Sequence, residues 1–302
     1  MNFFNMLKNF LLLLIVLQVA PPLIEGIKKQ YKSYLEPKAK IGLISFKGVL
    51  SDSSSHIKFL NSLFKDPSIK GILIKMECSG SASGTGQAIA HEIKSLKALH
   101  TKPVGVIVEN ICASGGYYIA STADFIVAPG MSLIGSIGVC MPYFFQVREL
   151  METYKIKTVP LKAGTYKNAT DPFVDVTEQD KKLLQGLLDD MYGQFVSDVA
   201  DNRHLARTQS AQWADGKIFS GKQAQALGLI DTLGSEYDAI KLMKKRALID
   251  GEIEFVSDNT QSTTLFSWLC SSEQNSQTSY MASIMESICT YLESRYAIFM
   301  QR

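Results

Sequence analysis

Apolar residues in the middle of the chain alternate between short continuous runs and helical spacing. Apolar runs at residues 40–48, 70–76 and 103–108 predict three buried strands, and a shorter run at 125–128 predicts a fourth. The stretches between the first three runs carry apolar residues three and four positions apart, as in helices that cover a sheet. Because strands that alternate with helices pair in parallel, the pattern predicts an α/β fold.

The second half of the chain is predicted to be mainly helical. Caps and apolar spacing indicate helices over residues 177–203, 220–227 and 235–247. A stretch of small residues at 78–86 (CSGSASGTG) reads as a loop after the second strand. No internal repeat is visible, which indicates a single-copy unit.

The N-terminus is predicted to be a membrane anchor. Phe10 to Ile24 is almost continuously apolar, follows Lys8, and is shorter than the ~20 residues that span a bilayer comfortably. This pattern is typical of a signal sequence, and a poor cleavage context favours an uncleaved anchor at residues 1–27 followed by a linker at 28–39. A buried core helix is the alternative interpretation.

The charges around this segment leave its orientation open. A signal-like start favours export of the body of the protein. The positive-inside rule alone favours a cytoplasmic body, because only one lysine precedes the apolar run and several follow it, namely Lys28, Lys29, Lys32, Lys38 and Lys40.

The C-terminal region changes in composition. Residues 257–279 are rich in Ser, Thr, Gln and Asn and read as a polar linker. Residues 280–302 have apolar positions at helical spacing and predict an amphipathic helix. Such a helix docks on its own domain or a sister subunit, or else on a membrane surface or a partner.

Composition excludes some classes of protein. With 302 residues, of which 46% are hydrophobic, the chain can bury a sizeable core. A net charge of +2 argues against a protein that coats nucleic acid. The 5 cysteines include no CxxC pair, so neither a disulfide framework nor a zinc site is predicted and the thiols are expected to be free and mostly buried.

Ser114 is the candidate nucleophile. It follows a predicted strand, precedes a short predicted helix, and is flanked by the small residues Ala113, Gly115 and Gly116. A serine placed there presents its hydroxyl at the end of the sheet, and the amides that follow can stabilise an oxyanion. The same position equally suits a serine that only caps the helix.

A serine nucleophile needs a base, and histidine is the usual one. The chain has 4 histidines, His56, His91, His100 and His204, and none lies in a loop with a catalytic pattern. A lysine kept neutral by burial is the other route, at a cost of roughly 4 kcal/mol for a pKa of about 7–8. Composition alone does not indicate which of the 31 basic residues would serve.

A resemblance to a known family narrows this choice. Residues 113–120 (ASGGYYIA) resemble the nucleophile segment of the signal peptide peptidase A family, which are Ser/Lys membrane proteases. Further segments match in the same order, namely 70–74 (KGILI), 123–128 (ADFIVA), 135–139 (GSIGV), 164–168 (GTYKN), 214–221 (ADGKIFSG) and 226–231 (ALGLID).

The resemblance implies roles for five residues. Ser114 would be the nucleophile and Lys167 the general base, with Ser136 orienting the lysine. The amides of Gly80 and Gly115 would form the oxyanion hole. No metal or other cofactor is implied, and a lysine base is consistent with the small number of histidines.

The resemblance also implies a fold and a biological setting. It predicts a protease domain at residues 40–256 with the Clp protease/crotonase fold of repeated β-β-α units. It implies a membrane-anchored serine endopeptidase that cleaves apolar peptides such as signal-peptide remnants. The expected assembly is a homo-oligomer whose sites are shared between subunits, with no nucleic-acid partner. The expected location is the bacterial cytoplasmic membrane, with the catalytic domain on the extracytoplasmic side.

One segment departs from the family pattern. The family's Ser-Pro-Gly-Gly is Cys78-Ser79-Gly80-Ser81 here, so a serine stands at the second glycine. If that position requires a positive φ, the serine is strained and the oxyanion loop shifts. This keeps open a catalytically impaired peptide-binding scaffold, and the shared fold keeps open a crotonase-type acyl-CoA enzyme.

Overall fold

The computed structural model describes residues 17, 18, 20–26 and 38–258. The chain divides into two units, Met1–Ser257 and Asp258–Arg302. The predicted C-terminal helix, nearly all of the polar linker before it and most of the predicted anchor lie outside the described residues. Within the described part of the chain, no helix is long and apolar enough to cross a membrane.

Strands and helices alternate through the first half of the described body, and helices predominate afterwards. The elements are β1 (Ala39–Leu50), α2 (Ser54–Lys65), β2 (Ile69–Ser81), α3 (Ser83–Leu99), β3 (Val104–Ala113), α4 (Gly115–Ala120), β4 (Phe125–Ala128), β5 (Leu133–Gly135), α5 (Arg148–Thr153), α6 (Glu178–Arg203), η1 (Arg207–Gln209), α7 (Ser210–Trp213), β6 (Ile218–Ser220), α8 (Gly221–Ala226), β7 (Thr232–Leu233), α9 (Glu236–Arg246) and β8 (Ile253–Ser257).

The strands form one largely parallel sheet, which confirms the predicted α/β class. Its order is β6-β5-β3-β2-β1-β8, and β4 joins it between β3 and β7. Every pairing is parallel except that of β5 with β6. β3 pairs with β4 along residues 105–107 and with β5 along residues 111–113. β3 therefore changes its pairing partner from β4 to β5 just before Ser114.

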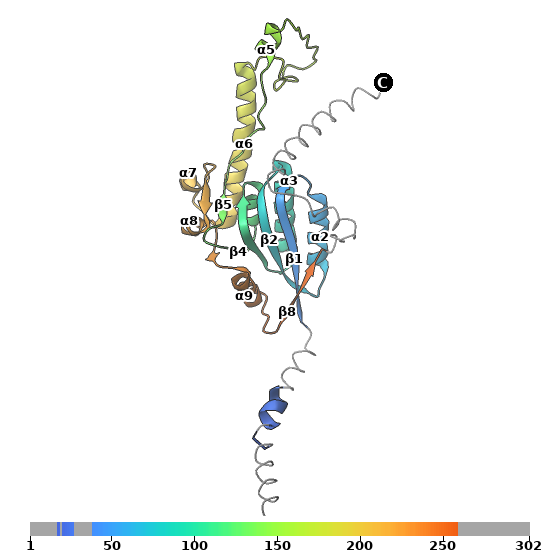
Figure 1. The fold of residues 1–302 in the computed structure, drawn as a ribbon, viewed down its shortest axis with the longest axis vertical. Helices are drawn as coiled ribbons and strands as arrows, with labels where there is room; N and C mark the ends of the chain where they lie inside the picture. The colour runs from blue at the N-terminus through green and yellow to red at the C-terminus, as the bar shows by residue number, and fades with distance from the viewer. Residues whose placement is uncertain (1–16, 19, 27–37, 259–302) are drawn as a thin grey trace, which may run out of the picture. The chain divides into compact units, whose positions relative to one another are not determined.

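Helices cover both faces of this sheet. Successive side chains of a strand point to opposite faces, and in the central strands the side chains on both faces are buried. Ile72, Ile74 and Met76 of β2 belong to the larger core cluster, together with residues of α2, α3, α4 and α6. Leu73, between the first two, belongs to a smaller cluster with residues of α9. Figure 1 shows α9 on a different side of the sheet from α2 and α3.

The predicted loop at 78–86 is the main correction to the expected elements. β2 continues to Ser81, and α3 begins at Ser83. The strand persists because β1 runs beside it to Leu50 and pairs with residues 78, 80 and 81 across a register shift. Small residues that resemble a flexible loop in the sequence are therefore held in a ladder.

Candidate active site

Ser114 occupies a strained turn between β3 and α4. Its φ of 50° and ψ of −126° lie outside the conformations that non-glycine residues usually adopt, at a cost of about 1–3 kcal/mol. Its N–H donates to the carbonyl oxygen of Gly135 at 2.8 Å, and its side chain makes no capping hydrogen bond. The hydroxyl is therefore not used as a helix cap. A strained serine between strand and helix is the arrangement of a nucleophile elbow.

Gly80 and Gly115 both lie beside Ser114. A Cβ added to Gly80 would lie 3.6 Å from the Cβ and 3.8 Å from the Oγ of Ser114. Gly115 is the next residue along the chain and the first of α4. The structure thus brings the two residues predicted for the oxyanion hole to the predicted nucleophile, because β2 and β3 are parallel neighbours that end at the same edge of the sheet.

Ser81 is accommodated without the backbone strain that the sequence suggests. Its φ is not positive, unlike those of Ser114 and Ser136. Its side chain lies between two glycines: an added Cβ would come within 1.9 Å of the Ser81 Oγ at Gly115, and within 2.4 Å of it at Gly86. The Ser81 Oγ is buried and has no hydrogen-bond partner among the described residues. The cost of this serine is therefore an unpaired hydroxyl, about 1–3 kcal/mol.

Ser136 joins Ser114 around one cavity of about 810 Å³. It follows β5, has a φ of 50°, and its N–H donates to the carbonyl oxygen of Lys217 at 2.7 Å. Residues of α3, α4 and α6 also line this cavity, namely Gln87, Tyr118, Met191, Tyr192, Gln194 and Phe195. Sequence reasoning missed these residues, because they lie on helices whose spacing only indicates a core face.

Lys167 is the predicted site residue that the structure does not bring to Ser114. It is exposed, lies in the segment between β5 and α6, and is not part of the cavity lining. Its N–H donates to the carbonyl oxygen of Gly164 at 3.3 Å. The part of the cavity wall that the structure describes contains no lysine.

Lys217 lies beside the cavity and forms an ion pair with Asp215. Its Nζ lies 2.5 Å from the Oδ2 of Asp215, which lines the cavity. The hydrogen bond to Lys217 holds the pKa of the Asp215 carboxyl below its usual value. Because its Nζ is engaged by Asp215, Lys217 does not take the place of Lys167.

The surface around Lys167 is unusually apolar. Large apolar side chains are exposed along this segment and the first half of α6, namely Tyr143, Phe144, Phe145, Leu150, Tyr154, Ile156, Val159, Leu161, Tyr166, Phe173, Leu183 and Leu187. We refer to this set as the exposed apolar surface. Figure 1 shows α5, which belongs to the segment, beyond the end of α6 and away from the sheet. Large apolar patches of this kind mark interaction surfaces in soluble domains.

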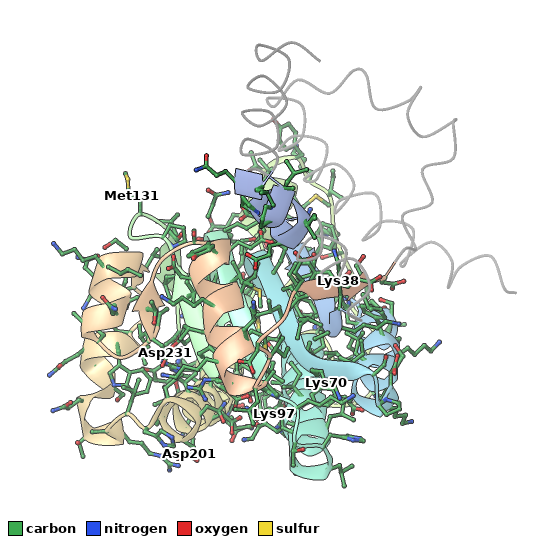
Figure 2. All side chains as sticks on the ribbon, turned by 90° about the horizontal axis from the view of Figure 1, so that it is seen from below. Lys38, Lys70, Lys97, Met131, Asp201 and Asp231 are labelled. Atoms are coloured by element: carbon green, nitrogen blue, oxygen red, sulfur yellow. The ribbon has the colours of Figure 1, made fainter. Side chains whose placement is uncertain are left out.

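A second cavity of about 480 Å³ lies among charged residues. Lys97, Asp201 and Asp231, labelled in Figure 2, belong to its lining. Lys97 pairs with Asp124 at 2.8 Å and Arg203 with Asp231 at 3.0 Å, so these charges already have partners. Within the described ranges, no cluster of His, Cys, Asp or Glu could hold a metal ion. The paired charges indicate a structural role for this region.

Comparisons with known proteins agree with the resemblance seen in the sequence. The model of "Peptidase family S49" matches residues 97–250. A provisionally named protease of Methanocaldococcus jannaschii is 38% identical over 65% of this chain and 62% of its own length. A provisionally named signal peptide peptidase SppA of Enterococcus faecium is 31% identical over 76% of this chain and 70% of its own. A provisionally named protease of Synechocystis is 33% identical over 67% of this chain and 72% of its own.

These matches place the protein in the class of peptidases. The chain belongs to peptidase family S49. The aligned region spans 62% of the Methanocaldococcus relative, so the two proteins do not correspond over their whole lengths.

Proposed function

We propose that the chain is a serine endopeptidase in which Ser114 is the nucleophile and Lys167 the general base. The observation that carries this proposal is the strained, uncapped Ser114 at the end of β3, open to a large cavity. Such strain persists where the surrounding structure holds a functional side chain in place. The proximity of Gly80 and Gly115 supports an oxyanion hole at the same point.

The mechanism follows from these roles. Neutral Lys167 removes the proton of Ser114 as the hydroxyl attacks a peptide carbonyl carbon. The amides of Gly80 and Gly115 stabilise the oxyanion, and Ser136 orients the lysine. Lys167 then protonates the leaving amine, and water hydrolyses the acyl-enzyme to release the second product and regenerate the serine.

The lysine of each site is proposed to come from a neighbouring copy of the chain. Lys167 is exposed and absent from the cavity of its own subunit. It lies within the exposed apolar surface, which a second copy would remove from water. In the resulting homo-oligomer, burial of Lys167 at the interface would favour its neutral form.

The proposed setting is a membrane. Residues 1–27 would anchor the enzyme to the cytoplasmic membrane of a bacterium, with the catalytic domain outside the cytoplasm and signal-peptide remnants as substrates. The relative from Enterococcus faecium carries the name signal peptide peptidase, which supports this substrate class. The parallel sheet with successive strand-helix units is compatible with the Clp protease/crotonase fold.

Substitution of the dyad tests the proposal. Ser114→Ala and Lys167→Ala are each expected to abolish cleavage of an apolar fluorogenic peptide, while circular dichroism shows a folded protein. Lys157→Ala is the matched control, because Lys157 is an exposed lysine of the same segment. Wild-type activity in either dyad variant would exclude the proposed roles.

A catalytically impaired scaffold is the second candidate, because Ser81 crowds Gly115 at the proposed oxyanion hole. An impaired enzyme would still bind peptides but would not form an acyl-enzyme. Single-turnover reaction with a peptide ester, read by mass spectrometry, separates the two candidates. An acyl group on Ser114 excludes the scaffold, and its absence in a protein that binds the ester supports it. A crotonase-type acyl-CoA enzyme would leave Ser114 unlabelled and turn over an acyl-CoA instead.

A further inference from the structure

A chain of hydrogen bonds runs through the helical part of the cavity lining and joins α3, α4 and α6. The Nε2 of Gln87 (α3) donates to the Oε1 of Gln194 (α6) at 3.1 Å and lies 3.5 Å from the Oη of Tyr118 (α4). The Nε2 of Gln194 donates to the Oδ2 of Asp190 at 2.9 Å. The Oη of Tyr118 donates to the Oδ2 of Asp198. The chain thus ends on a carboxylate at each side.

The two carboxylates determine the direction of every bond between them. An ionised carboxylate only accepts hydrogen bonds, so Gln194 turns its amide N–H toward Asp190 and its carbonyl toward Gln87. Tyr118 likewise donates to Asp198 and leaves its oxygen as an acceptor. Burial and the bond to Asp198 raise the pKa of Tyr118, so the phenol keeps its proton at neutral pH. The amide nitrogen of Gln87 must therefore donate both to the carbonyl of Gln194 and to the phenol oxygen of Tyr118.

This arrangement leaves the carbonyl oxygen of Gln87 as the free group. Within the described residues, the buried side-chain polar atoms without a partner are the Ser81 Oγ and the Trp213 Nε1. The Oε1 of Gln87 is not one of them, and Gln87 is half-buried and lines the cavity. Since its N–H groups are held by Gln194 and Tyr118, the amide cannot flip without breaking the chain. It presents a fixed hydrogen-bond acceptor.

The surroundings of this acceptor favour positive charge. Asp215 lines the same cavity and is paired with Lys217 beside it, and the described lining itself contains no lysine, arginine or histidine. Asp190 and Asp198 stand behind Gln194 and Tyr118 and add negative potential. Met191 and Phe195 supply apolar surface on the same wall. An aliphatic stem with a cationic donor at its end matches both features.

We propose that Gln87 is a specificity-determining residue, and that its cavity selects a lysine or arginine side chain next to the cleaved bond. This inference rests on the proposed function, because it assigns the cavity beside Ser114 to the substrate residue whose carbonyl is attacked. It adds a basic residue to the apolar substrates expected above. A substrate peptide in which a basic residue adjoins an apolar run would meet both requirements.

The test uses two fluorogenic peptides that differ only in the residue before the cleaved bond, which is lysine in one and norleucine in the other. Norleucine keeps the four-carbon stem and lacks the ammonium. With the full-length protein in detergent, kcat/KM is expected to be at least about tenfold higher for the lysine peptide, the range of one hydrogen bond to a charged group. Equal values, or a preference for norleucine, would overturn the inference.

Two substitutions at Gln87 move this ratio in opposite directions. Gln87→Met removes the acceptor and is expected to lower the lysine-to-norleucine ratio toward one. Gln87→Glu adds a negative charge and is expected to raise the ratio. Gln185→Met is the matched control, because Gln185 lies on α6 outside the cavity and bonds the exposed Asp189 at 2.7 Å. A ratio that stays at the wild-type value in both Gln87 variants would overturn the inference.

Binding to the Ser114→Ala variant, measured by calorimetry with the same peptides, separates this inference from the proposed function. Tighter binding of the lysine peptide without cleavage by the wild type would support the role of Gln87 and reject the peptidase mechanism. Cleavage of both peptides at equal rates would reject the role of Gln87 and leave the mechanism in place. A protein that neither binds nor cleaves them would contradict both.

Discussion

The two serines of the proposed site share an unusual backbone conformation. Ser114 and Ser136 both have a φ of 50°, and the N–H of Ser114 donates to the carbonyl of Gly135, which precedes Ser136. Strain at two linked positions is expensive, so the pairing of β3 with β5 must hold both turns in place. The positions around them leave little space for larger side chains. The Cβ of an alanine at Gly115 would fall 1.9 Å from the Ser81 Oγ.

The unpaired hydroxyl of Ser81 leads to a stability prediction. Ser81→Ala is expected to raise the free energy of unfolding by about 1 kcal/mol, because it removes a buried polar group that has no partner in the described structure. Urea denaturation measures the change. Ser79→Ala, at an exposed position of the same strand, is the control and should alter stability little. A loss of stability in Ser81→Ala would show that the hydroxyl is satisfied.

Tyr117 leads to a prediction about alkaline pH. It is fully buried, its hydroxyl donates to the carbonyl of Leu229 at 2.7 Å, and burial raises its pKa well above the ordinary value of about 10. Below pH about 10 the tyrosine is protonated in both the folded and the unfolded state, and its contribution to stability is fully present. As the pH rises further, the unfolded state ionises first, so stability falls.

Unfolding free energies measured between pH 8 and 11.5 test this. Tyr117→Phe is expected to lose less stability over that interval than the wild type, although its starting value is lower because the bond to Leu229 is missing. Tyr237→Phe, at a residue that is 74% exposed, should follow the wild-type curve. Identical pH dependence in all three proteins would contradict the role of Tyr117.

At the residue scale, the sequence pointed to Ser114, Ser136, Gly80 and Gly115, and the structure brings these four together. They lie in three separate short segments, at 78–81, 113–120 and 135–139, and their roles were inferred from the family resemblance of those segments. Gln87 and Tyr118 could not be predicted as a pair, because their contact depends on how α3 and α4 pack.

Among the elements, three long apolar runs predicted β1, β2 and β3, a shorter run predicted β4, and the capped spacing predicted α6. Thr177 indeed caps α6: its hydroxyl accepts from the N–H of Asp180, and its own N–H donates to the Asp180 carboxylate. Strands β5 to β8 were not predicted. They are two to five residues long and are stabilised by pairing with partners distant in sequence rather than by a local pattern.

The contact between β3 and β4 leads to a prediction at this scale. A Cβ at Gly105 would fall 2.2 Å from the Cζ of Phe125, so Gly105→Ala is expected to destabilise the protein by about 1–3 kcal/mol. Gly130→Ala is the control, because an added Cβ meets nothing within 4 Å there. Chemical denaturation measures both variants.

A double-mutant cycle completes this test. Phe125→Leu removes the ring, so adding Gly105→Ala to it should cost less than adding it to the wild type. Additive costs would show that the ring does not restrict residue 105.

At the level of the whole molecule, a single copy of the chain holds Ser114 at a cavity and Lys167 on its exposed surface. The exposed apolar surface around Lys167 is what a subunit interface would bury. The family resemblance of their motifs implied both residues of the proposed dyad. It could not show whether they meet within one subunit, because that depends on the path of the long segment between β5 and α6.

Mixing two inactive variants tests the shared site. Ser114→Ala and Lys167→Ala subunits are dissociated together, reassembled, and assayed with the apolar peptide. In a ring where each site takes its serine and lysine from different subunits, about a quarter of the sites become intact. Activity recovered to that level supports sharing. A mixture that reassembles but stays inactive would show that both residues belong to the same subunit.

Covalent labelling of the nucleophile tests the proposed roles of Ser114 and Lys167 most directly. A fluorophosphonate probe is applied to the assembled wild type, Ser114→Ala and Lys167→Ala, and the labelled residue and the labelling rate are read by peptide mass spectrometry. We expect a single adduct on Ser114 of the wild type, none in Ser114→Ala, and labelling at least about a hundredfold slower in Lys167→Ala. An adduct on another residue, or undiminished labelling without Lys167, would contradict the assignment of Ser114 and Lys167 as the catalytic dyad.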